Sequence, residues 1–210
     1  MKGYFTTKRI TLIGLLGAIA GLLMYFPKFP IPFMPPFMEF DFSSVIEILG
    51  AFILGPLGGA LVVIVKIIIK LITQGTSTMF IGELSNVIIS LSFVIPAAII
   101  YHKHRTKDGA IKALIQATLF ATFIATVSNL VLIFPLYAFY MGFSTEALIG
   151  MVQSVNPLVT NKFLLYLSGV VPFNLIKYGV CSAVTFIIYK RTKKIIDQLF
   201  HDSNNQAYKS

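Results

Sequence analysis

The sequence predicts an all-α membrane protein, a bundle of six transmembrane helices with both the N and C termini on the cytoplasmic side. Of the 210 residues, 56% are hydrophobic and 12% are charged, and the mean hydropathy is +0.83. Soluble domains carry about twice that charged fraction. Several apolar runs approach the roughly 20 residues that cross a bilayer as a helix. The formal charge is +9, but the basic residues gather at the ends of these runs. Orientation in a lipid bilayer therefore explains them better than nucleic acid as a partner.

The basic clusters also set the number of spans. They lie in residues 2–9, 102–112 and 190–194. The positive-inside rule places all three in the cytoplasm, so an even number of spans must separate the first two. One helix over 45–72 would give three spans there, whereas a break at the Gly-Pro-Leu-Gly-Gly sequence of 55–59 gives four. We therefore expect a single integral-membrane domain over the whole chain. Its predicted spans are 10–26, 44–54, 57–73, 84–101, 112–139 and 163–189.

The first span contains small residues four apart, Gly14 with Ala18 and Gly17 with Gly21. Such pairs let another membrane helix approach closely. The partner can be a second protein or a helix of the same chain, and the pattern favours neither. The segment after this span is rich in Pro and Phe and has no small-residue cleavage site, so we do not expect the span to be a cleaved signal peptide.

The loop over residues 27–42 is dense in Pro and Phe. Prolines stiffen a loop by fixing φ. One interpretation is a lid that closes over a flat ligand, with Phe37, Phe40 and Phe42 as candidates. The other is an aromatic belt at the membrane interface.

Lys177 is the most informative residue, because it lies in the middle of the last apolar run. A lysine at the bilayer centre costs about 2.5–3.5 kcal/mol on insertion scales, so its ammonium is expected to face a cavity, a partner or water. Asn174 precedes it by three residues and shares its helix face. Pro172 can start or kink a helix there. The alternative is that Lys177 snorkels to an interface.

Other polar residues near the predicted outer side point to the same region. Glu83 stands at a helix start, where the helix dipole favours a carboxylate, and Asn86 lies one turn deeper. Asn129 lies within the fifth span. For Lys66 and Lys70, four residues apart, we expect snorkelling to the outer interface. Together the asparagines and Lys177 predict a binding site for a small neutral or weakly acidic molecule, open to the outside.

The sequence argues against catalysis. All three histidines fall in predicted cytoplasmic segments, so no intramembrane Ser-His or His-metal site can be drawn. The chain contains no HExxH, GxSxG or GxxxxGK[ST] motif. Cys181 is the single cysteine. We therefore expect no enzyme activity, no metal and no cofactor. An intramembrane enzyme lacks a nucleophile–base pair, and a plain membrane scaffold would not explain a lysine in mid-span.

Five motifs follow one another along the chain: FMEFDFSS at 37–44, AFILGPLGG at 51–59, GELSN at 82–86, the stretch from Asn129 to Pro135, and VVPFNLIKYGVCSAVTFIIYK at 170–190. In combination they resemble one known family, the riboflavin-specific substrate-binding (S) components of energy-coupling factor (ECF) transporters. The resemblance runs from the first span to Lys190.

The resemblance implies a function and a set of residues. It implies a six-helix bacterial plasma-membrane protein that captures riboflavin from outside, with flavin mononucleotide as a second candidate ligand. Transport would need a transmembrane coupling protein and two cytoplasmic ATPases, which use the ATP. The small residues of the first span would dock the coupling protein, although the family often has Ala-xxx-Ala there. An S component for thiamine or pantothenate is the alternative. The residues implied to bind substrate are Asn129, Asn174, Lys177, Glu83, Asn86 and Phe40.

Overall fold

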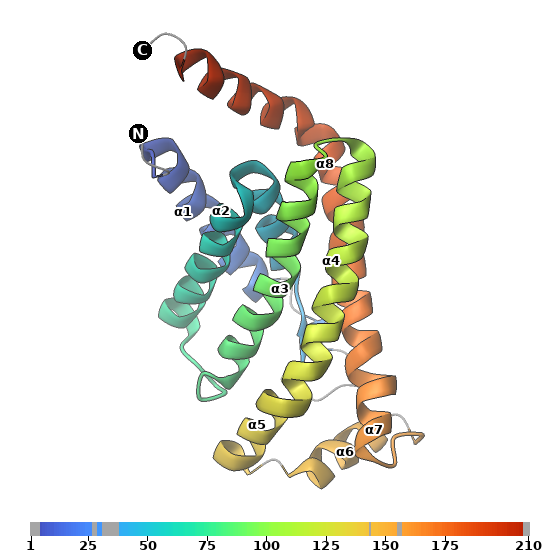
Figure 1. The fold of residues 1–210 in the computed structure, drawn as a ribbon. Helices are drawn as coiled ribbons and strands as arrows, with labels where there is room; N and C mark the ends of the chain where they lie inside the picture. Colours follow the sequence, from blue (N-terminus) through green and yellow to red (C-terminus); the bar gives the residue numbers. More distant parts are fainter. Residues whose placement is uncertain (1–4, 27–28, 31–37, 143, 155–156, 208–210) are drawn as a thin grey trace.

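A computed structural model describes residues 5–26, 29–30, 38–142, 144–154 and 157–207. The described chain is predominantly helical, and its long helices share one general direction (Figure 1). Five helical segments of this described part are long and apolar enough to cross a membrane. The predicted helical membrane class is therefore confirmed. The helices are α1 (Thr7–Tyr25), α2 (Ser43–Gln74), α3 (Ile81–Lys103), α4 (Lys107–Ser128), α5 (Phe134–Met141), α6 (Thr145–Gln153), α7 (Lys162–Leu165) and α8 (Val171–Ala207).

Helix α2 is interrupted at Gly55, within the break predicted at 55–59. Gly55 has φ +86° and ψ −179°, a conformation that is almost restricted to glycine. The chain reverses direction there. The evidence is the close approach of the two halves: a Cβ placed on Gly59 would lie 2.5 Å from the Cβ of Ala51. His102 of α3 also contacts this turn through a 3.2 Å hydrogen bond between its Nε2 and the Ala51 carbonyl oxygen. The halves of α2 before and after Gly55 therefore pack side by side.

Helix α1 packs along α2. Gly17 and Gly21 are buried there, against the side chains of Val65 and Ile69. These two glycines therefore serve packing within the chain, one of the two roles that the pattern allows. Gly14 and Ala18 are exposed on the other side of α1, so they remain available to an external partner.

Two π-helical turns precede the two prolines of the later helices. The first, η1 (Asn129–Ile133), joins α4 to α5, and the second, η2 (Tyr166–Val170), joins α7 to α8. Each ends just before an X-Pro pair, at Pro135 and Pro172. Proline lacks an N–H and its ring crowds the carbonyl four residues back. A wider turn relieves that conflict, and such turns are frequent at functional sites.

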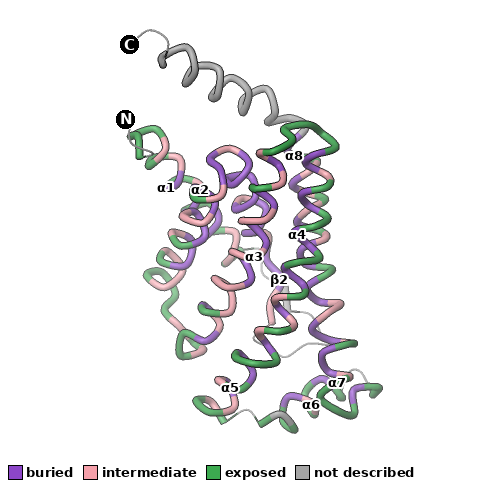
Figure 2. The backbone as a smooth tube through the Cα atoms, viewed as in Figure 1, coloured by how far each residue is buried: buried purple, intermediate pink, exposed green. Residues whose placement is uncertain are grey.

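The loop after α1 returns into the bundle as a short antiparallel ladder of β1 (Phe29–Pro30) and β2 (Glu39–Phe40), in which Phe29 pairs with Phe40. The start of α1 and the end of α8 lie at the same end of the bundle, whereas α5, α6 and α7 gather at the other (Figure 1). Buried positions line the inner faces of α2, α3 and α4 (Figure 2). Much of that core is a seam of small side chains between α3 and α4, Ala97, Ala98, Ala113, Ala117, Ala121 and Ala125.

Candidate ligand-binding site

A cavity of about 430 Å³ lies in the half of the bundle away from the chain ends, and a second of about 90 Å³ adjoins it. Both are lined by Glu39, Gly82, Asn86, Tyr137 and Lys177. The volume of the larger one falls within the roughly 300–1,000 Å³ common for small-molecule sites. These five residues come from β2, α3, α5 and α8, and the larger cavity is also lined by residues of α1, α2, the turn before α3 and α6.

Lys177 enters this cavity from α8 and is held by Glu39 of β2 and by Asp41, which follows that strand. Its Nζ donates to Asp41 Oδ2 at 2.8 Å and to the Glu39 carbonyl oxygen at 3.2 Å. Burial would raise the pKa of the Asp41 carboxyl, but the Lys177 ammonium and hydrogen bonds overcome this and hold that pKa below its usual range. Lys177 therefore faces a cavity and a carboxylate, and the snorkelling alternative is wrong for it.

Lys66 is fully buried, so the prediction that it snorkels to the interface is wrong. It forms an ion pair with Glu47, which is also fully buried. Its Nζ also donates to Asn86 Oδ1 at 2.6 Å, and Ser43 and Ser90 lie at 3.4 and 3.3 Å. A charge removed from water and lipid needs such partners. The turn at Gly55 supplies Glu47 and Ser43 by bringing the two halves of α2 together, and α3 supplies Asn86 and Ser90.

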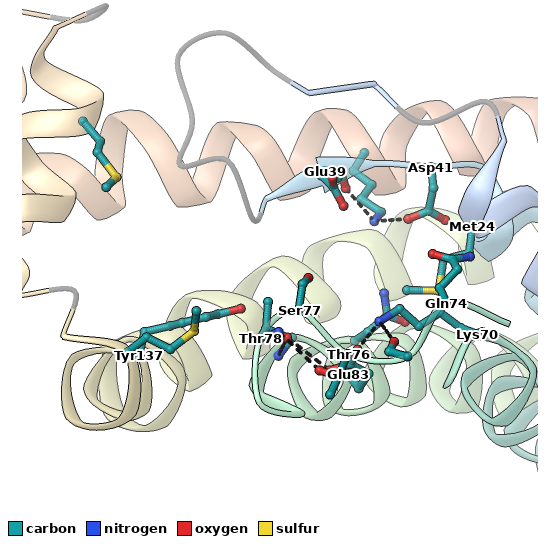
Figure 3. A pocket seen from close by; sticks show the side chains of 16 residues that line it. Met24, Glu39, Asp41, Lys70, Gln74, Thr76, Ser77, Thr78, Glu83 and Tyr137 are labelled. Carbon is teal, nitrogen blue, oxygen red and sulfur yellow. Dashed lines mark hydrogen bonds and ion pairs between the residues drawn. The ribbon is translucent and has the colours of Figure 1, made fainter. Parts of the chain in front are cut away.

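Lys70 is partly buried near the C-terminal end of α2. It pairs with Glu83 and donates to the Gly75 carbonyl oxygen at 2.8 Å. Glu83 Oε2 also accepts hydrogen bonds from Thr76 at 3.1 Å and Thr78 at 3.2 Å. Figure 3 shows Glu83, Thr76 and Thr78 on one wall of the cavity, opposite Glu39 and Asp41. Glu83 thus lines the cavity as one member of a polar wall.

The two asparagines of the later helices present their amides in the same way. Asn129, the first residue of η1, donates from Nδ2 to the Ala125 carbonyl oxygen at 2.7 Å. Asn174 donates from Nδ2 to the Val170 carbonyl oxygen at 2.8 Å. One N–H of each amide nitrogen is thus engaged within its own helix, so each side chain can present Oδ1 as an acceptor and its second N–H as a donor. Asn129 lines the smaller cavity, and Asn174 lies buried beside it, one turn before Lys177.

The aromatic residues of the first loop are arranged differently from the prediction. Side chains alternate along an extended strand, so Phe40 faces away from Glu39 and Asp41, which line the larger cavity. Its ring makes an edge contact with Phe42, with centroids 5.2 Å apart. Within the described chain, Phe40 lines neither cavity. Phe37 lies outside the described residues.

Sequence reasoning missed Asp41 and Glu47 as lysine partners, and Tyr137 as a cavity residue. A signal was available for the first two, because an acid and a lysine within apolar segments need each other. Three lysines then match three acids around the site: Lys177 with Asp41, Lys66 with Glu47 and Lys70 with Glu83. Such a site suits an uncharged ligand with hydrogen-bonding edges. Within the described residues, no group of three His, Cys, Asp or Glu side chains could hold a metal.

Comparison with known proteins gives a consistent result. A family model described as "ECF transporter, substrate-specific component" matches residues 8–189. The chain is 33% identical to the riboflavin transporter RibU of Staphylococcus aureus (strain TCH60), over 91% of this chain and 94% of that protein. It is 29% identical to the riboflavin transporter FmnP of Bacillus subtilis (strain 168), over 91% and 95%.

A solved structure, titled "Structure and mechanism of the S component of a bacterial ECF transporter", matches with a TM-score of 0.70 and 32% identity. The match covers 90% of this chain and 97% of that one. Members of this family are transporter components and not enzymes. The chain is therefore a multi-pass bacterial membrane protein that belongs to the substrate-specific components of ECF transporters.

Proposed function

We propose that this chain captures riboflavin from outside the cell and delivers it to the cytoplasm with an energy-coupling module. The module consists of a transmembrane coupling protein and two ATPases. The observation that carries the proposal is the Lys177 ammonium, which is buried at the wall of two adjoining cavities together with Asn86 and Asn129. The names of the relatives in Staphylococcus and Bacillus support the same ligand.

The hydrogen-bonding groups of the site complement a flavin. The pyrimidine edge of the isoalloxazine presents carbonyl acceptors and one N–H donor. A lysine offers only donors, and an asparagine oxygen only accepts. Lys177 can therefore serve a ring carbonyl, while the Oδ1 of Asn129 or Asn174 serves the ring N–H. Met24, Met141 and Met151 line the larger cavity, and thioethers make favourable contacts with aromatic rings.

We further propose six spans with both termini in the cytoplasm. The reversal at Gly55 supports two spans within α2, and the start of α1 and the end of α8 share one end of the bundle (Figure 1). The basic segment of Lys103 to Lys107 also falls between α3 and α4. Labelling of single cysteines introduced at residues 77 and 105 of a Cys181→Ser variant in intact cells tests this. Only the first should react with an impermeant maleimide.

The absorbance spectrum of the protein purified without added ligand tests the ligand class. We expect a yellow preparation with flavin absorbance, and quenching of riboflavin fluorescence on titration into ligand-free protein. Flavin mononucleotide, thiamine and pantothenate are titrated in parallel. A colourless preparation that binds thiamine or pantothenate and leaves flavin fluorescence unchanged would contradict the proposal.

The partner surface of α1 has its own test. Gly14 and Ala18 are exposed on one face, and small residues there permit close helix contact. Substitution of Ala18 by Leu should reduce riboflavin uptake in cells that contain the energy-coupling module, while leaving riboflavin binding by the purified chain unchanged.

A further inference from the structure

The buried pair Glu47–Lys66 has no role in the function as proposed so far. Neither residue is among the described residues that line the two cavities. Both side chains have 0% exposure. A fully buried ion pair is weak evidence for stability, because apolar replacements of similar volume are often neutral or stabilising. The position of the pair, directly behind a cavity residue, therefore calls for a different explanation.

That cavity residue is Asn86, which lines both cavities. Within the described residues, the Asn86 side chain has two hydrogen bonds, and its Oδ1 is the acceptor in both. Lys66 Nζ donates to it at 2.6 Å and Ser90 Oγ at 3.3 Å. An ammonium can only donate, so the amide cannot turn over without setting its NH₂ group against a positive charge. Its Nδ2 is thereby directed away from Lys66.

We infer that the Glu47–Lys66 pair is a positioning device, which fixes Asn86 as a hydrogen-bond donor toward the bound ligand. Glu47 holds the Lys66 ammonium in place, and Lys66 in turn sets the orientation of the Asn86 amide. This inference rests on the proposed function, because it assigns Asn86 to the same site. Asn129 differs, because one N–H of its Nδ2 is engaged by the Ala125 carbonyl and its Oδ1 can serve the ligand as an acceptor.

Asn86 therefore gives the cavity a fixed donor, and Asn129 can supply an acceptor. A ligand that presents an oxygen acceptor toward Asn86 is bound, such as a ribityl hydroxyl or a ring carbonyl. A ligand that presents an N–H there meets another N–H. The Glu47–Lys66 pair therefore influences which ligand binds by orienting Asn86, without contacting the ligand itself.

A double-mutant cycle with riboflavin separates positioning from a general structural role. The paired variant Glu47→Leu/Lys66→Met removes both charges and keeps an apolar filling. In full-length protein in detergent, we expect it to weaken riboflavin binding about threefold to tenfold, as for one net neutral hydrogen bond. In the Asn86→Ala background the same pair of substitutions should change the affinity less than twofold, because the amide that it orients is absent.

The outcomes are distinct. Equal losses with and without Asn86→Ala, in a protein whose unmodified form binds riboflavin, would overturn the positioning role and leave the proposed function intact. Absence of riboflavin binding by the unmodified chain would overturn both. If the apolar pair does not fold, Glu47→Gln/Lys66→Gln keeps hydrogen-bonding side chains of similar length without the ammonium, and the same comparison applies.

Tyr101→Phe is the matched control. It also removes a buried polar contact, the 2.9 Å bond between the hydroxyls of Tyr101 and Tyr189. Tyr101 lies 15 residues beyond Asn86 on α3, about 22 Å along the helix. Its substitution should leave the riboflavin affinity unchanged, and a loss as large as that of the paired variant would show that any buried polar change in the bundle disturbs the cavity.

Discussion

The interior of the helical bundle differs between its two ends: it is charged around the cavities and apolar toward the chain ends. Around the cavities, the interior holds the ion pairs of Lys177, Lys66 and Lys70 with three carboxylates. Toward the chain ends, the interior is apolar: the alanine seam between α3 and α4 starts there, beside the stacked rings of Phe52 and Tyr101, and runs toward the cavities. Buried charge is expensive and close apolar packing is not. The difference indicates that the cavity end is built for recognition and the alanine end for stability.

The largest effect is expected from breaking one buried pair. Lys66→Met leaves Glu47 charged and unpaired inside the bundle, which should lower the free energy of unfolding by about 3–5 kcal/mol. Chemical or thermal unfolding in detergent measures this. The double variant Glu47→Leu/Lys66→Met should recover most of the loss, since it leaves no charge behind. A double variant as unstable as the single one would contradict this account of the cavity end.

The next effect is on binding. Lys177→Ala should weaken riboflavin binding by at least about tenfold, since a hydrogen bond to a charged group contributes roughly 1.5–3 kcal/mol, and Asn174→Ala by about threefold to tenfold, since its amide is neutral. Fluorescence quenching titrations of ligand-free protein give the dissociation constants. Unchanged titrations for both variants would remove these residues from the site. Asn174 is the sharper test, because it lies beside the smaller cavity rather than in its wall.

A substitution at the turn of α2 tests the opposite end. Gly59→Ala would place a Cβ 2.5 Å from the Ala51 Cβ and 2.7 Å from Val94 Cγ1. Overpacking of this kind costs about 1–3 kcal/mol of stability. Unfolding measurements should show that loss, while the folded protein keeps its riboflavin affinity. An affinity that falls together with stability would mean that the two ends are not independent.

The smallest effect is expected from removing one hydroxyl group near the chain ends. Tyr101→Phe removes the hydroxyl that bonds to Tyr189, which should cost about 0.5–1.5 kcal/mol of stability. The change is measured by the same unfolding experiment. A gain in stability would show that this hydroxyl pair, like the ion pairs, is retained for something other than the fold.

Part of the fold and of the site followed from local pattern. The apolar runs predict the membrane helices because burial in lipid requires about 20 apolar residues. The break at 55–59 follows from Gly-Pro chemistry and from charge balance across the bilayer. Lys177 predicts a cavity or a partner, because an isolated charged lysine inside a membrane span costs too much free energy. Each of these depends on neighbouring residues in the chain or on the bilayer itself.

Other features depend on contacts between distant residues, so only the tertiary structure decided them. The local pattern predicts that Lys66 reaches an interface, whereas the reversal at Gly55 places it beside Glu47 in the interior. The pattern left Gly17 and Gly21 open to two partners until α1 packed on α2. Phe40 turns away from the cavity because strand register, set by pairing with Phe29, selects which side chains face inward. Sequence alone determined which apolar segments cross the membrane and that Lys177 needs a partner there, because both follow from the cost of lipid burial. The packing of helices decided that Lys66 is buried as well, and which side chains each of these residues meets.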